Sequence, residues 1–234
     1  MAEEKLKEGD FIKLEYSGKL ASSGKYFDTT SEEVAKANKL FNPQMKYLPQ
    51  LIVVGKGYAI KGIDEALIGA SVGESKTVEV SPEKGFGAKD PSLVSVIPLT
   101  EFHKREINPV PGLVVTLDGK EARVKSVSSG RVMVDMNHPL AGEKLVYELK
   151  VIGKITKVEE KVSALLERNR IGGKPSVKSD GTVEIINSPA PNQDINYFFG
   201  KAGFIASVLA NIPEAKKVRF IEDFVKEGEA GKKQ

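Results

Sequence analysis

The 234-residue chain contains no cysteine and only two histidines, His103 and His138. Without cysteine there are no disulfide bonds, thiolate metal sites or cysteine nucleophiles. The two histidines stand in no recognisable ligand pattern, and motifs such as GxSxG, HExxH and a Walker loop are missing. We therefore expect no metal ion and no other cofactor, and any catalysis has to proceed without a nucleophile.

Charge of one sign and long apolar runs are also scarce. The 35 Lys and Arg residues against 32 Asp and Glu leave a net charge of +3, whereas a dedicated nucleic-acid binder needs a concentrated basic face. The longest charge-free stretch near the C-terminus, Ala202–Pro213, is too short to cross a bilayer, and the charged N-terminal segment lacks the apolar core of a secretory signal. We expect a soluble cytoplasmic protein that binds neither nucleic acid nor membranes.

Hydrophobic residues make up 40% of the chain and charged residues 29%, which excludes disorder over most of its length. A chain of this length forms either one large domain or two to three small ones. We find no internal repeat that would indicate a solenoid.

Apolar periodicity predicts strands and short helices in the first part of the chain. Residues 11–20 alternate as a strand with one solvated face, and Ser31 is placed to cap a short helix. Residues 51–54 form an apolar strand, residues 60–70 a short helix with Ile60, Ile63 and Leu67 on one side, and residues 75–81 a further strand.

Glycine and proline punctuate the chain from Gly85 to Gly112, so no long helix is expected there. Three β-like runs follow, and Asp118-Gly119 between the first two is the strongest hairpin signal in the sequence. The runs are residues 113–117, 121–127 and 131–135, with a long strand predicted over residues 145–155.

The last third reads as an α-β-β-α-β series that is long enough to bury a small core of its own. An amphipathic helix is predicted over residues 158–170 and a second helix over residues 194–212. A hairpin is expected at Asp180-Gly181, a closing strand over residues 218–225, and a solvated tail after it.

The candidate chemistry consists of aromatic residues beside one acid. Tyr16 lies late on the first predicted strand, and Phe27-Asp28 end the second. By itself, a Phe-Asp pair at a strand end is more typical of a core residue followed by a turn-capping carboxylate. Phe86 between two glycines, and Tyr147 on the long strand, would ordinarily fill a core.

Several motifs together carry a resemblance to a known family. They are Tyr16–Leu20 (YSGKL), Gly24–Thr30 (GKYFDTT), Val54-Gly55, Ile60–Ala66 (IKGIDEA), Val72–Glu74 (VGE), Ser81–Gly87 (SPEKGFG) and Asn137–Gly142 (NHPLAG). In order and spacing the series resembles an FKBP-type peptidyl-prolyl isomerase, and the last motif resembles NHxLAG of the SlyD-like branch. The resemblance covers about residues 5–155, and the extra C-terminal third is similar to the long archaeal members.

The resemblance implies an α+β fold in which a twisted antiparallel sheet wraps on a short helix. In the SlyD-like branch an insert-in-flap chaperone domain interrupts the isomerase domain. The implied domains are an isomerase domain of residues 1–92 plus 137–155, an insert of residues 93–136, an α+β domain of residues 156–228, and a disordered tail of residues 229–234.

Carried over position by position, the resemblance also implies a prolyl pocket. Its lining would be Tyr16, Phe27, Asp28, Ala59, Ile60, Ile63, Phe86, Leu140 and Tyr147. The Ile60 amide would grip a substrate carbonyl, and Tyr16 would hydrogen-bond the Asp28 carboxylate. Ile63 stands where many relatives have a Trp, Phe86 where many have a Tyr, and Tyr147 where a Phe is common. We expect weak binding of macrolide inhibitors but preserved prolyl turnover.

The implied partners are unfolded or nascent proline-containing polypeptides. An insert this small leaves part of its apolar surface exposed, and Leu99, Phe102, Ile107, Val132 and Val134 are the candidate substrate contacts, although most such side chains have to fill the insert's own core. Phe198-Phe199 and the predicted strand of residues 218–225 in the last third could support a homodimer or contact a substrate. Two alternatives remain open at this point: a non-catalytic holdase whose isomerase pocket has decayed, and an adaptor.

Overall fold

The computed structural model describes residues 5–187 and 193–223, which form two compact units. The first unit comprises the described residues up to Gly18, Tyr26–Val78, and the described residues from Tyr147 onward. The second comprises Lys19–Lys25 and Glu79–Val146. The expected tail and the end of the predicted last strand lie outside the described residues.

The main sheet has the strand order β2-β1-β9-β4, with β3 pairing antiparallel to β1. Its strands are β1 (Phe11–Leu20), β2 (Tyr26–Thr29), β3 (Gln50–Val53), β4 (Ser75–Val80) and β9 (Leu145–Ile155). The helices between them are α1 (Glu32–Ala37) and α2 (Lys61–Leu67). The predicted strands are confirmed, and the Ser31 hydroxyl accepts a hydrogen bond from the Val34 amide at 3.4 Å, as expected of a helix cap.

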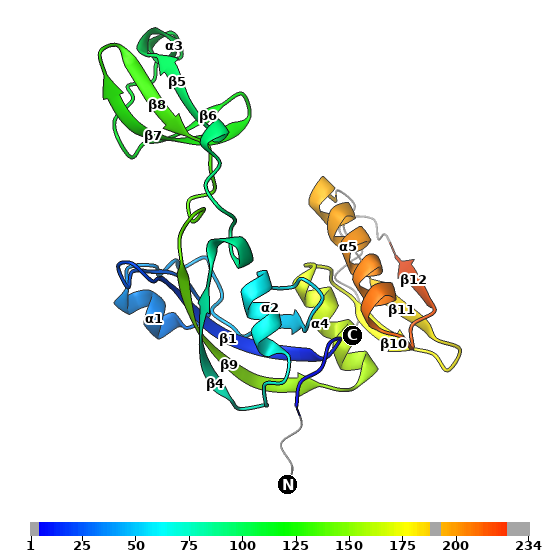
Figure 1. The fold of residues 1–234 in the computed structure, drawn as a ribbon. Coiled ribbons are helices and arrows are strands. Elements are labelled where there is room, and N and C mark those ends of the chain that lie inside the picture. The colour runs from blue at the N-terminus through cyan, green and yellow to red at the C-terminus, as the bar shows by residue number, and fades with distance from the viewer. Residues whose placement is uncertain (1–4, 188–192, 224–234) are drawn as a thin grey trace. The chain divides into compact units, whose positions relative to one another are not determined.

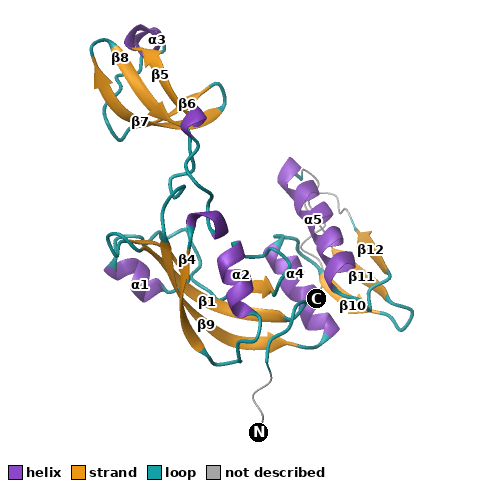
Figure 2. Ribbon diagram, viewed as in Figure 1, coloured by secondary structure: helices purple, strands orange, loops and turns teal. Residues whose placement is uncertain are grey.

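The second unit contains the insert, a four-stranded antiparallel sheet of order β5-β8-β7-β6 (Figure 2). Its elements are η1 (Pro82–Lys84), η2 (Pro91–Leu93), β5 (Val94–Pro98), α3 (Leu99–Lys104), β6 (Val114–Leu117), β7 (Lys120–Ser128) and β8 (Arg131–Asp135). The predicted hairpin is present, because Leu117 pairs with Lys120 across Asp118-Gly119, both at positive φ. Strand β5 and helix α3 were not predicted by the sequence pattern.

The C-terminal third is the predicted α-β-β-α-β series, with α5 lying along the sheet in Figure 1. Its elements are α4 (Val158–Arg168), β10 (Lys174–Val177), β11 (Thr182–Asn187), α5 (Ile195–Asn211) and β12 (Lys217–Glu222). Strand β11 pairs antiparallel with β10 and parallel with β12. The parallel pair requires a crossover connection, which α5 supplies.

The core of the C-terminal third is continuous with that of the main sheet. Phe11 of β1, Val53 of β3 and Ile155 of β9 belong to the same buried cluster as Val162 and Leu165 of α4. Side chains alternate along a strand, so Phe11 lies on the opposite face of β1 from Ile12. The C-terminal series therefore shares its core with the first unit. No helix in the described part of the chain combines the length and the apolar character that a membrane span needs.

Candidate functional site

Three aromatic rings from three strands meet in the first unit. The Tyr147 ring of β9 lies edge-on to Tyr16 of β1, with centroids 6.1 Å apart, and edge-on to Phe27 of β2, with centroids 5.7 Å apart. Edge-to-face contacts at these distances are favourable because the positive ring edge meets the negative ring face. We call Tyr16, Phe27 and Tyr147 the aromatic cluster.

The predicted hydrogen bond between Tyr16 and Asp28 is present: the Tyr16 hydroxyl donates to the Asp28 carboxylate at 2.8 Å. Burial, followed by the nearby charge of Asp28, raises the pKa of Tyr16 above its ordinary value. The same two causes raise the pKa of Tyr147. Both phenols therefore stay protonated near neutral pH, and the Asp28 carboxylate lies beside the cluster through its hydrogen bond to Tyr16.

The loop before α2 is organised by a buried carboxylate. Asp64, which is 8% exposed, accepts hydrogen bonds from the amides of Gly55 and Gly57, both at 2.8 Å. The Ile60 carbonyl accepts from the amides of Ile63 and Asp64 at 3.0 Å and so starts the helix. Among the residues that the structure describes, the Ile60 amide has no acceptor, so it is available to a ligand.

Of the other residues assigned to the loop and helix, Ile63 is 4% exposed and Ala59 is half-buried. The first unit thus holds seven of the nine predicted pocket residues, namely Tyr16, Phe27, Asp28, Ala59, Ile60, Ile63 and Tyr147.

The remaining two predicted pocket residues, Phe86 and Leu140, lie in the second unit and are linked by His138. The Phe86 ring stacks on the His138 imidazole, with centroids 4.3 Å apart and planes at 2°. Nδ1 of His138 accepts a hydrogen bond from the Leu140 amide at 3.1 Å. One imidazole therefore holds both residues in place within this unit.

Of the five insert residues that the sequence suggested for substrate binding, three lie in the insert's core and two pack against it. Phe102, Val132 and Val134 are at most 1% exposed, and Leu99 and Ile107 pack against the same core cluster. Phe102, Val132 and Val134 therefore have almost no exposed surface to offer a substrate, whereas Leu99 and Ile107 are half-buried and their predicted role stays a prediction. The sequence did not show which of the two faces of each strand is turned toward the core. In the structure, the large apolar residues of the insert that are exposed are Val94, Val96, Val110, Val114 and Met133.

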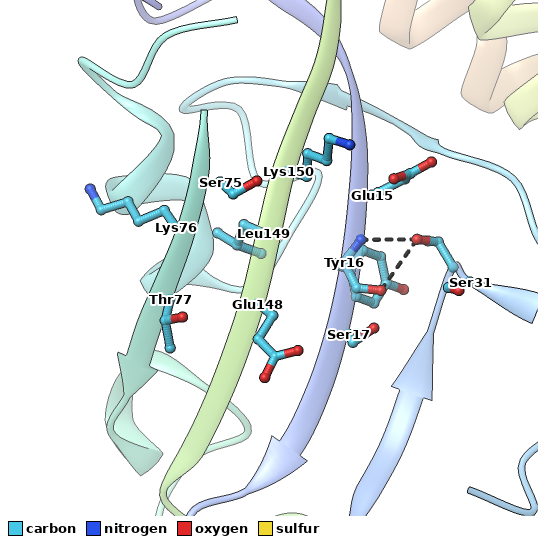
Figure 3. A pocket seen from close by; sticks show the side chains of 11 residues that line it. Glu15, Tyr16, Ser17, Ser31, Ser75, Lys76, Thr77, Glu148, Leu149 and Lys150 are labelled. Carbon is cyan, nitrogen blue, oxygen red and sulfur yellow. Dashed lines mark hydrogen bonds between the residues drawn. The ribbon is translucent and has the colours of Figure 1, made fainter. Parts of the chain in front are cut away.

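A polar hollow of about 340 Å³ lies on the main sheet, as Figure 3 shows. Glu15 and Ser17 of β1, with Glu148 and Lys150 of β9, contribute to its lining. Tyr16 of the aromatic cluster and Leu149 of β9 also contribute to the lining. Its charged lining suits polar contacts and does not provide an apolar pocket for proline.

Sequence reasoning did not assign Gly18 and Asp64 to the site, although both stand in the quoted motifs. A Cβ on Gly18 would lie 2.7 Å from Cε1 of Tyr147 and 2.8 Å from Cζ of Phe27, so both rings depend on a glycine there. A glycine inside an alternating strand is the signal that could have identified it, because it often marks a close approach. Asp64 gave no comparable signal, because an acid in the first turn of a helix is common.

Within the described residues, no group of three His, Asp or Glu side chains is arranged to hold a metal ion. The candidate site offers the aromatic cluster and aliphatic side chains as apolar surface. Its polar groups are the Ile60 amide, which has no acceptor among the described residues, and the Asp28 carboxylate, which accepts a hydrogen bond from the Tyr16 hydroxyl. Such a set can bind an apolar, amide-containing ligand.

Comparison with known proteins identifies the family. A family model described as FKBP-type peptidyl-prolyl cis-trans isomerase matches residues 2–102, and one described as FKBP26, IF domain, matches residues 95–140. The chain is 41% identical over 146 residues to the short-type peptidyl-prolyl cis-trans isomerase of Methanocaldococcus jannaschii, a match that covers 62% of this chain and 92% of that protein.

Two bacterial relatives are more distant. The chain is 31% identical over 109 residues to a probable FKBP-type 16 kDa isomerase of Pseudomonas fluorescens, covering 44% of this chain and 71% of that protein. It is 31% identical over 121 residues to the FKBP-type peptidyl-prolyl cis-trans isomerase SlyD of Helicobacter pylori, a match that covers 50% of this chain and 64% of that protein. This chain belongs to the family of FKBP-type peptidyl-prolyl cis-trans isomerases, and the α+β fold expected from the sequence is confirmed.

Proposed function

We propose that this isomerase acts on X-Pro bonds of unfolded or partly folded polypeptides, and that the aromatic cluster forms one wall of its prolyl pocket. The observation that carries the proposal is the convergence of Tyr16, Phe27 and Tyr147 beside the Asp28 carboxylate. Three rings from separate strands form an apolar surface against which a proline ring can pack.

A pocket of this kind lowers the isomerisation barrier by solvation. Rotation about a peptide bond costs about 18–20 kcal/mol because amide resonance is lost as the bond twists. The twisted amide is less dipolar than the planar one, so an apolar surface with little water disfavours the ground state more than the transition state. A thousandfold acceleration needs only about 4 kcal/mol of this difference. No nucleophile or metal ion is required.

The polar groups then have positioning roles. The Ile60 amide, which has no acceptor among the described residues, donates to a substrate carbonyl and fixes the chain beside the proline. Asp28, held by the Tyr16 hydroxyl, interacts with the amide as it twists. Ile63 is the apolar floor, and Phe86 and Leu140 are assigned to the same pocket through the family resemblance alone.

We propose that the insert captures unfolded chains. Its boundaries at residues 93 and 136 are supported by two ties between the entering and leaving segments: the Met136 amide donates to the Leu93 carbonyl at 3.0 Å, and Asn137 exchanges hydrogen bonds with Asp90. Val96 and Met133 are opposite each other on neighbouring strands, and both are exposed. An exposed apolar surface tethered to an isomerase raises the local concentration of substrate.

A homodimer through the C-terminal third, the proposed domain of residues 156–228, is favoured by the surface of α5. Ile195, Phe198 and Phe199 are 57–70% exposed on this one helix, and such apolar patches mark interaction sites. Light scattering of the full chain tests this, since a monomeric mass for the wild type would contradict it. With Phe199→Asp, the mass should fall from dimer to monomer.

The isomerase proposal is tested on proline-containing tetrapeptides by NMR exchange between the cis and trans forms. The wild type should accelerate exchange, and Phe27→Ala should lower kcat/KM about tenfold, because an aromatic contact and its apolar area are lost. Phe199→Ala, which removes an exposed phenylalanine on α5, is the matched control and should leave kcat/KM unchanged. An inactive wild type, or a Phe27→Ala variant as active as the control, would contradict the proposal.

A further inference from the structure

The C-terminal third contacts the loop that leads into α2. The guanidinium of Arg168, at the end of α4, lies over the Tyr58 ring with Cζ 4.6 Å from the ring centroid. The same guanidinium donates to the Leu51 carbonyl of β3 at 3.2 Å. Nδ2 of Asn211, at the end of α5, donates to the Tyr58 hydroxyl at 3.4 Å.

Tyr58 is two residues before Ile60, and its ring packs against the buried cluster shared by α4 and the main sheet. The loop of residues 55–60 is therefore held from two sides. Asp64 fixes its first half through the amides of Gly55 and Gly57. The second half, which presents the Ile60 amide, is held at Tyr58 by the C-terminal third.

We infer that Arg168 is a positioning residue for prolyl isomerisation: it fixes Tyr58, and through Tyr58 the Ile60 amide that receives the substrate carbonyl. This inference rests on the proposed function of that amide. It gives the C-terminal third a role in the isomerase site itself, separate from any role in dimerisation. Placement matters here because the Ile60 amide can bond the substrate carbonyl only when the two atoms come within hydrogen-bond distance at a favourable angle.

The contact depends on the shape of arginine as well as its charge. A planar guanidinium can stack on an aromatic face while its N–H groups bond a carbonyl in the same plane. A lysine at this position keeps the charge but offers a compact ammonium on a flexible stem, so it cannot make both contacts in that geometry. Arg168→Lys therefore releases Tyr58 without removing charge from the surface.

The test compares Arg168→Lys with Arg170→Lys in the full chain, using the tetrapeptide exchange assay and backbone amide NMR. Arg170 is exposed and lies two residues further along, so it is a matched control. Because the Ile60 amide binds ground state and transition state alike, Arg168→Lys should raise KM about three- to tenfold with kcat within about twofold of the wild type. The amide resonances of Tyr58, Ala59 and Ile60 should shift in this variant only.

Thermal unfolding of both variants separates positioning from general stability, and the KM increase should persist well below the unfolding transition. A further Arg168→Lys substitution in a Tyr58→Leu background should have no additional effect on KM. If Arg168→Lys matches Arg170→Lys in KM and in the three amide resonances, the inference is overturned while the isomerase proposal stands. A wild type without activity would overturn both.

Discussion

The backbone of Gly18 lies against the Tyr147 ring so closely that a Cβ at this position would come within 2.7 Å of Cε1. The same Cβ would lie 2.8 Å from Cζ of Phe27. Real Cβ atoms do not approach other atoms so closely. The Phe27 and Tyr147 rings can therefore occupy their observed positions only because residue 18 is a glycine.

Gly18→Ala should therefore displace Phe27 and Tyr147 from each other. We expect a loss of about 1–3 kcal/mol in the free energy of unfolding, typical of overpacking, and a fall of about tenfold or more in kcat/KM on tetrapeptides. Gly153→Ala on β9, where an added Cβ meets no atom within 4 Å, is the control and should change neither quantity. Full activity in Gly18→Ala would show that the rings do not form the pocket wall.

Asp64 should be important to stability through the two amides that it accepts. Asp64→Asn turns one acceptor oxygen into a donor that faces an amide N–H, so one hydrogen bond is lost and a donor is left unpaired. We expect a decrease of about 1.5–3 kcal/mol in the free energy of unfolding by urea denaturation, with faster amide exchange at Gly55 and Gly57. Asp118→Asn, in an exposed turn that suits asparagine, is the control; equal effects of the two substitutions would refute this role.

Glu222 of β12 should make stability pH-dependent. Its carboxylate accepts hydrogen bonds from Lys201, at 2.7 Å, and from the Tyr197 hydroxyl. Lys201, followed by Tyr197, holds the pKa of Glu222 below its ordinary value, and burial and this carboxylate raise the pKa of Tyr197 to about 12. A carboxyl with a lowered pKa in the folded state contributes stability above its unfolded pKa, and that contribution is lost as the pH falls through the folded value.

Glu222→Gln should accordingly lower the free energy of unfolding by about 1 kcal/mol at pH 7. The difference from the wild type should shrink as the pH falls toward the lowered pKa of Glu222, because protonation removes the charge that Lys201 and Tyr197 contact. The free energy of unfolding by urea, measured from pH 7 to pH 3, gives this difference. Glu214→Gln, at an exposed glutamate in the loop between α5 and β12, is the control. A difference that stays constant over this range would contradict the assignment.

The outward face of the insert should matter for large substrates only. Replacing Val96 and Met133 together by serine removes an exposed cross-strand apolar pair without touching the buried core. We expect roughly two- to fivefold weaker suppression of the aggregation of an unfolded protein, with tetrapeptide turnover unchanged. Thr116→Ser, at an exposed position of β6, is the control. Equal loss on both substrates would refute this division of labour.

Local patterns predicted much of the fold. The alternation along β1, the Ser31 cap and the Asp118-Gly119 turn depend on neighbours in sequence, so a single chain reveals them. Strand β5 and helix α3 are short, and β5 ends at Pro98, so neither presents a clear period. The parallel pairing of β11 with β12 and the packing of α4 on Phe11 depend on long-range contacts that periodicity does not encode.

Part of the candidate site could likewise be predicted from the sequence, and part could not. Tyr16 and Asp28 could be paired from the motif series, and their hydrogen bond is present. The insert's surface could not be predicted, because both parities of its strands carry apolar residues: Val96 and Met133 point outward, whereas Val132 and Val134 point inward. Arg168 could not be predicted either, since its partner Tyr58 is far away in sequence and a cationic residue in the last turn of a helix is common.

The central claim is that the aromatic cluster catalyses prolyl isomerisation in protein substrates. The most direct test is the proline-limited slow phase in the refolding of an unfolded protein, measured with the wild type and with Phe27→Ala. The slow-phase rate should rise in proportion to wild-type concentration, and Phe27→Ala should be about tenfold less effective. A slow phase that the wild type leaves unchanged at equimolar concentration would contradict the account.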